Sequence, residues 1–228
     1  MSPKFVNREE KKKIIARAAL ELFALIGFAS TSVDQIAIAA GVGKGTLYEY
    51  FETKTDIFVA AIVEWMHQFE NTITAEIECI DDPVERMKTI VEVSTALVDP
   101  IDPLTARFSI EILQHTLLED GALYERRHVM KEVHTGMRKI LENILLDGIS
   151  KGVSRPEWAR DAEKFAINLL GYIDGISLHY LMSRNDFKIR EQVEFTLQNV
   201  IGMLRSKPEA SWGSVRPEGR RIAVGMKH

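Results

Sequence analysis

Apolar residues recur along most of the chain with the spacing of one face of an α-helix. The first such stripe runs from Ile15 to Ile26, its apolar side chains three or four residues apart, and Gly27 follows where a helix would end. This pattern predicts a first helix from about Arg8. No stretch of useful length alternates between apolar and polar residues as a half-buried strand does. The expected fold class is therefore all-α.

Three further helices are predicted next. Ser32 stands three residues before Gln35, the spacing of a capping box, and the short apolar stripe that follows ends at Gly41. Leu47 and Phe51, four residues apart, mark a third short helix after a bend. A long fourth helix is indicated by apolar residues three or four apart at Phe58, Ile62, Trp65 and Phe69.

Later helices are marked by their ends. At 82–83 and at 102–103 an aspartate precedes a proline, which places a carboxylate acceptor at the N-cap and the proline at the first helical position. A long periodic stretch covers about 122–152. Two more helices, each with an apolar stripe, are predicted at about 157–183 and 187–205.

The chain is long enough for two domains that share a core. Its 228 residues are 46% hydrophobic and 27% charged, which is the balance of a folded protein. We expect a three-helix N-terminal domain at 8–53, which the long fourth helix joins to a larger helical domain at 54–206. Residues 207–228 contain Pro, Gly and scattered Arg without any period, and we expect a flexible tail there.

Cysteine usage and hydropathy indicate a protein of the cytoplasm. Cys79 is the only cysteine, so no intramolecular disulfide can form. Even the most apolar stretch, 165–182, carries Asp174 and His179, and no run of 18 or more uncharged apolar residues exists. We therefore expect no membrane span and a cytoplasmic localisation.

The net charge of −4 is distributed unevenly along the chain. Residues 1–60 hold 8 Lys and Arg against 7 Asp and Glu, residues 61–204 hold 15 against 24, and residues 205–228 hold 6 against 2. The middle of the chain is acidic, so only its two ends could favour a phosphate backbone.

The most informative segment is 32–54, SVDQIAIAAGVGKGTLYEYFETK, which joins the second and third predicted helices through a glycine-containing bend. Two short helices joined in this way form a helix-turn-helix, whose second helix enters the major groove of DNA. The outward face of that helix carries a cation, a hydroxyl, phenols and a carboxylate, which can contact phosphates and base edges: Lys44, Thr46, Tyr48, Glu49 and Tyr50. Lys54, at the start of the fourth helix, adds a cation for one more phosphate.

This segment resembles the TetR family of repressors, whose signature is close to T-x-x-x-I-A-x-x-A-G-V-S-x-G-T-L-Y-x-Y-F-x-x-K. The match includes Ile36-Ala37, Ala40-Gly41-Val42, Gly45-Thr46-Leu47-Tyr48, Tyr50-Phe51 and Lys54. The resemblance implies that Ser32 caps the first motif helix and touches phosphate. It implies that the DNA backbone is held by Lys44, Thr46, Tyr50 and Lys54. It places nearest the bases Gly45, Tyr48 and Glu49.

Two positions of the motif depart from the family pattern. Gly43 stands where the family usually has a serine or threonine, so the second motif helix lacks a side-chain cap. Glu49 stands where base readout is expected, and its carboxylate repels phosphate. That carboxylate can instead accept a hydrogen bond from cytosine N4, or a neighbouring cation can hold it.

The remainder of the chain resembles the family in length, in its helical pattern and in a final helix pair of the kind used for dimerisation. On this basis the residues expected at a homodimer interface are Phe165, Leu169, Ile176, Tyr180, Leu197 and Leu204. The candidates for an apolar ligand pocket, each of which taken singly is more often plain core, are Trp65, Phe69, Phe108, Met130, Met137 and Tyr172. Asp174 and His179 either orient a ligand or pair across the interface.

The sequence offers no positive support for catalysis. The segment GVGKGT lacks the first glycine and the final Ser or Thr that a phosphate-binding loop requires. Isolated polar residues without partners at metal-ligand spacing are interpreted as structural or solvated: His115, His134, His179, Glu111, Glu119 and Asp120. We therefore expect no enzymatic activity, no cofactor and no metal site.

These observations favour a repressor that binds a palindromic operator as a homodimer and that a small, largely apolar ligand releases. The competing interpretation is a ligand-carrying or enzymatic helical protein with a vestigial DNA motif, against which the intact phosphate-facing residues speak. A third interpretation keeps DNA binding but makes the protein an activator, or a regulator that needs no ligand.

Overall fold

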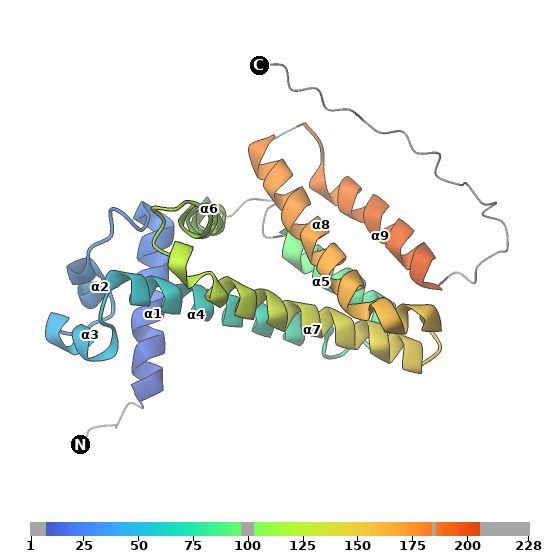
Figure 1. Ribbon diagram of the computed structural model, residues 1–228, viewed down its shortest axis with the longest axis horizontal. Helices are drawn as coiled ribbons and strands as arrows, with labels where there is room; N and C mark the ends of the chain where they lie inside the picture. The colour runs from blue at the N-terminus through green and yellow to red at the C-terminus, as the bar shows by residue number, and fades with distance from the viewer. Residues whose placement is uncertain (1–7, 97–102, 184–185, 206–228) are drawn as a thin grey trace.

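The computed structural model describes residues 8–96, 103–183 and 186–205, and their regular structure is entirely helical, as predicted (Figure 1). The N-terminal helices are α1 (Arg8–Ile26), α2 (Val33–Ala39), α3 (Lys44–Tyr50) and α4 (Lys54–Ile77). The following helices are α5 (Pro83–Ala96), α6 (Pro103–Leu117), α7 (His128–Ser150), α8 (Ala162–Met182) and α9 (Ile189–Arg205). Short 3₁₀ helices precede α7 and α8, η1 (Tyr124–Arg126) and η2 (Pro156–Asp161). The expected flexible tail, 207–228, lies outside the described residues.

The ends of α1 and α2 follow local rules. The Ser32 hydroxyl accepts from the Gln35 N–H at 3.2 Å, and the Gln35 side chain accepts from the Ser32 N–H at 2.8 Å, which completes the predicted capping box. Gly27 (φ 84°) and Gly41 (φ 64°) follow the helices in the left-handed region that favours glycine. The end of α1 and both ends of α2 are therefore determined by residues within one helical turn of each end.

The start of α7 differs from the prediction, which placed it at about 122. Leu123 is buried, and its N–H donates to the carbonyl oxygen of His115 at 3.0 Å, which turns the chain back onto the end of α6. The Arg126 N–H then closes the short η1 turn on the Leu123 carbonyl. This contact with a distant residue takes the place of the first turn of α7, so that helix begins only at His128.

Two hydrophobic clusters form the core, and α4 contributes to both. The N-terminal cluster combines α1–α3 with the first half of α4, including Phe58 and Ile62, and with Phe108 of α6. The second cluster combines Ile73, near the end of α4, with α5, α7, α8 and α9. Figure 1 shows α4 running from the small helices toward the larger bundle beside α7. The first half of α4 therefore belongs to the N-terminal cluster and its end to the second cluster, whereas the sequence-based domain boundary was expected at residue 54.

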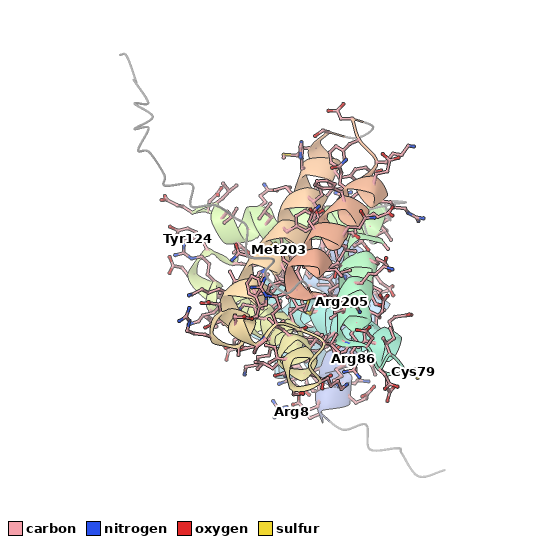
Figure 2. The ribbon with its side chains drawn as sticks, turned by 90° about the vertical axis from the view of Figure 1, so that its right-hand side faces the viewer. Arg8, Cys79, Arg86, Tyr124, Met203 and Arg205 are labelled. Carbon is pink, nitrogen blue, oxygen red and sulfur yellow. The ribbon has the colours of Figure 1, made fainter. Side chains whose placement is uncertain are left out.

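Ion pairs close the end of the larger bundle that is remote from α2 and α3 (Figure 1). Arg205, at the end of α9, lies 2.6 Å from a carboxylate oxygen of Asp82, and Asp82 also accepts from the Val84 N–H at the start of α5. Arg86 of α5 pairs with Asp147 of α7 at 3.2 Å. Figure 2 shows Arg86 and Arg205 at this end of the molecule. No helix of the described segments is long and apolar enough to cross a membrane.

Candidate nucleic-acid interface

The second helix of the motif, α3, presents one clearly exposed face. Leu47 is fully buried and anchors α3 in the N-terminal cluster, while the backbone bond from Val42 N–H to the Ala37 carbonyl fixes the bend. Gly43 caps α3 without a side-chain hydrogen bond, as its missing side chain requires. The expected contact residues that are exposed on α3 are Lys44, Gly45, Tyr48 and Glu49, whereas Thr46 and Tyr50 are half-buried beside Leu47.

Lys44 is not free on this face, because it forms an ion pair with Asp34 of α2. Its ammonium lies 2.8 Å from one carboxylate oxygen of Asp34 and 3.0 Å from the other. The hydrogen bond and the negative charge of Asp34 raise the pKa of Lys44. Sequence reasoning missed this pair, because ten residues and a bend separate its members and no spacing rule applies.

Arg8 is a second cation that sequence reasoning missed. Its guanidinium lies 5.8 Å from the centre of the Tyr50 ring and donates to the backbone carbonyl of Glu49 at 3.3 Å. The start of α1 is thereby tied to the end of α3. The bond reaches the carbonyl of Glu49 and leaves the side-chain carboxylate on the exposed face.

Lys54 turns toward the protein's own loop between α1 and α2. Its ammonium donates to the carbonyl oxygens of Phe28 at 2.9 Å and Thr31 at 3.1 Å, and it lies 4.4 Å from the centre of the Phe28 ring. Burial lowers the pKa of this lysine. A phosphate contact of the kind implied by the resemblance would require the ammonium to leave these carbonyls.

The last turn of α1 and the same loop are both bonded by α6. Arg107 donates to the Leu25 carbonyl at 2.8 Å, and the Phe28 N–H donates to the Glu111 carboxylate at 3.2 Å. His115 lies 3.3 Å from Glu111, and its ring packs edge-on against Phe28. Glu111 and His115, interpreted from the sequence as ordinary structural residues, therefore tie α6 to the loop that follows α1.

The six candidate ligand residues divide between the two core clusters. Trp65 and Phe108 pack edge to face with ring centres 5.5 Å apart, and Met130 belongs to the same N-terminal cluster. The other three belong to the second cluster: Phe69, Met137 and Tyr172. Within the described residues, a groove of about 550 Å³ between α8 and α9 is lined by Tyr172. The set is thus not brought together around one described cavity.

The expected dimer residues need correction at three positions. Leu169, Leu197 and Leu204 are buried in the chain's own second cluster, so they offer no surface that a second copy could cover. Phe165, Ile176 and Tyr180 are half-buried against that cluster. Helices α8 and α9 are apolar on more than one face, and the spacing of apolar residues alone does not show which face packs into the core. The exposed apolar residues of these helices are instead Ile167, Leu178, Met182, Phe195 and Met203.

The two polar residues of α8 that were singled out contact neighbouring elements. Asp174 lies 3.8 Å from His134 of α7, and the His179 ring lies 5.1 Å from that of Phe187. Within the described residues no group of three or more His, Cys, Asp and Glu side chains is arranged to hold a metal ion.

Comparison with known proteins identifies the family. The family described as bacterial regulatory proteins, tetR family, matches residues 15–61, which cover most of α1, all of α2 and α3, and the first turns of α4. The fatty acid metabolism regulator protein of Bacillus subtilis is 30% identical over 146 residues, which cover 64% of this chain and 72% of that protein. The transcriptional regulator TtgR of Pseudomonas putida is 28% identical over 207 residues, 88% of this chain and 94% of that protein.

A solved structure extends the likeness over nearly the whole described chain. The fatty acid degradation regulator FadR from Bacillus halodurans superimposes with a TM-score of 0.65 and is 26% identical, covering 86% of this chain and 97% of that chain. The all-helical architecture, the helix-turn-helix with its exposed α3 and these relatives agree. The chain belongs to the TetR family of DNA-binding transcriptional regulators.

Proposed function

We propose that this regulator is a repressor that binds a palindromic operator as a homodimer and that a small apolar ligand releases. The observation that carries the proposal is the exposed face of α3, on which Lys44, Tyr48 and Glu49 lie while Leu47 holds the helix from behind. Two copies of α3 related by a two-fold axis would enter successive major grooves about 34–36 Å apart.

The proposed division of labour on DNA follows the chemistry of these side chains. Gly45, Tyr48 and Glu49 would lie nearest the base edges in the major groove. The proposed contacts to phosphate come from Ser32, Lys44, Thr46, Tyr50 and Lys54. Such contacts set register and affinity, whereas base contacts set sequence preference.

The proposed dimer interface is the exposed apolar face of α8, extended by α9. Residues 167, 171, 175, 178 and 182 share one face of α8, and they include the exposed Ile167, Leu178 and Met182. At Gly171 and Gly175 an added Cβ would meet no heavy atom within 4 Å, so a second helix could approach closely. Phe195, 66% exposed, adds apolar surface from α9. Covering such a face with a second copy removes it from water.

The proposed ligand is largely apolar. The relative from Bacillus subtilis is named a fatty acid metabolism regulator, which supports a long apolar group as one class of ligand. The proposed route from ligand to DNA is α6, because Arg107 bonds the last turn of α1 and Glu111 bonds the loop that Lys54 also holds. For ligand and operator to oppose each other, the coupling free energy would be about 1–3 kcal/mol.

An enzymatic or ligand-carrying protein with a vestigial motif is not favoured, since the family and the named relatives are transcriptional regulators. The experiment that tests the proposal is selection of duplexes from a random library by the purified protein at moderate salt. Recovery of a palindrome with half-sites about one helical turn apart, lost in Tyr48→Ala, is the expected result. Weak retention of all sequences alike would contradict it.

A further inference from the structure

The ion pair between Asp34 and Lys44 lies on the surface that is proposed to face DNA. Asp34 belongs to the first turn of α2 and Lys44 to the first turn of α3, and both side chains are more than half exposed. The ammonium is 2.8 Å and 3.0 Å from the two carboxylate oxygens, so it is shared by both. A carboxylate in this position offers Lys44 the same kind of acceptor that a DNA phosphate would offer.

Asp34 makes neither of the two hydrogen bonds of the capping box of the helix on which it lies. The N-terminus of α2 is capped by Ser32 and Gln35, whose two hydrogen bonds are complete without Asp34. The two short helices are held together by buried Ile36 and Leu47. An amide at position 34 would therefore leave the fold of the motif intact.

Lys44 is the one cation of α3, in a domain with little excess positive charge. Residues 1–60 hold only one more Lys and Arg than Asp and Glu, and Lys54 is engaged by loop carbonyls. Sequence-independent affinity for DNA depends mainly on cations that neutralise phosphates. A carboxylate that occupies Lys44 in the free protein must be displaced, or left to repel the phosphate, when DNA binds.

We propose that Asp34 is an internal competitor of DNA phosphate for Lys44 and thereby limits the affinity of the regulator for DNA. The inference rests on the proposed function, because it takes Lys44 as a phosphate contact. Since phosphates carry no sequence information, Asp34 lowers the affinity for operator and for unrelated duplexes by the same factor. Its effect is exerted through Lys44 and not through the overall charge of the domain.

The test is a double-mutant cycle of Asp34→Asn, Lys44→Ala and the double variant, with DNA binding measured by fluorescence anisotropy on the selected operator and on a random duplex. The Asp34→Asn variant should bind both duplexes about fivefold more tightly at low salt, because two exposed ion pairs act in the dimer. The gain should fade as salt rises. In the Lys44→Ala background the same substitution should change affinity by less than about 1.5-fold.

Glu21→Gln is the matched control, because it removes one negative charge from an exposed position of α1 without touching Lys44. It should give little of the gain, and circular dichroism should show that every variant is folded. An equal gain in the Lys44→Ala background, or from Glu21→Gln, would overturn the proposal in favour of general charge repulsion. A change confined to the operator would overturn it in favour of a base contact. Absence of any DNA binding by the wild-type protein would overturn the proposed function as well.

Discussion

Replacement of Lys54 by methionine separates the two roles that its ammonium could have. In the structure the ammonium bonds the carbonyls of Phe28 and Thr31 and lies against the Phe28 ring. Methionine keeps an apolar side chain of similar reach but has no donor, so both carbonyls lose their charged partner. If the ammonium holds the loop, the substitution lowers stability; if it holds a DNA phosphate, the substitution lowers affinity.

The magnitude follows from these contacts. A hydrogen bond from a charged donor contributes about 1.5–3 kcal/mol, and an exposed cation–π contact about 0.5–1 kcal/mol. Lys54 is half-buried, so water can replace part of what the two carbonyls lose. We therefore expect the free energy of unfolding to fall by about 2 kcal/mol, or roughly 4–8 °C in Tm for a chain of this length.

The assay is urea unfolding followed by circular dichroism at one fixed protein concentration, since dimerisation makes stability depend on concentration. Lys44→Met is the matched control, because it makes the same change at an exposed lysine of the motif. The control should leave stability unchanged and weaken binding to all duplexes, with a salt slope smaller by about two units, one from each protomer. Wild-type stability in Lys54→Met, whatever its DNA binding, would refute the loop-holding role of the ammonium.

Three further outcomes are expected. Burial alone would raise the pKa of Glu64, but hydrogen bonds from Arg17 and Gln68 outweigh it and hold the pKa below its ordinary value. The stabilisation is therefore present above the ordinary pKa and is lost as the pH falls through the lower folded value. In urea titrations the deficit of Glu64→Gln should shrink in acid, and a constant deficit would contradict this. Gly27→Ala should lower the free energy of unfolding by about 1–2 kcal/mol, because φ is 84° and the new Cβ would lie 2.6 Å from a Glu111 carboxylate oxygen. Unchanged stability in urea unfolding would show that the loop adjusts without cost. Leu178→Asp should convert the dimer to a folded monomer in light scattering, since Leu178 is 38% exposed on the proposed interface, and a persistent dimer would place the interface elsewhere.

Helix ends were predictable from the sequence where the residues that determine them are neighbours. Ser32 and Gln35 cap α2 on each other, and Gly41 ends it, so three residues within one short segment define both ends. The start of α7 was predicted too early because the bond between Leu123 and His115 joins segments that only the tertiary fold brings together. Helix-end signals read from neighbouring residues cannot predict such a contact.

The chemistry of the motif was visible in the sequence, but its pairing was not. The spacing of the motif indicates which residues of α3 turn outward, and Lys44 and Tyr48 are indeed exposed. Whether an outward cation meets a carboxylate depends on the angle between two helices, and this angle brings Asp34 to Lys44. The burial of Leu169, expected at the dimer interface, has a related reason: Leu169 and Leu178 are both apolar, and only the packing of α8 decides which one is buried.

Phe28 is a residue on which α4 and α6 converge in the N-terminal cluster. Its N–H is bound by Glu111 of α6 and its carbonyl by Lys54 of α4, so opposite sides of one residue are tied to different helices. Its ring packs against Phe58 of α4 at 4.8 Å and against His115 of α6 at the same distance. A displacement of α6 would therefore either carry Phe28 and Lys54 with it or break half-buried hydrogen bonds. Close-packed contacts of this kind favour two distinct arrangements of the helices over a continuous deformation. For this reason a ligand that moves α6 need not touch α3 to change how the motif is presented to DNA.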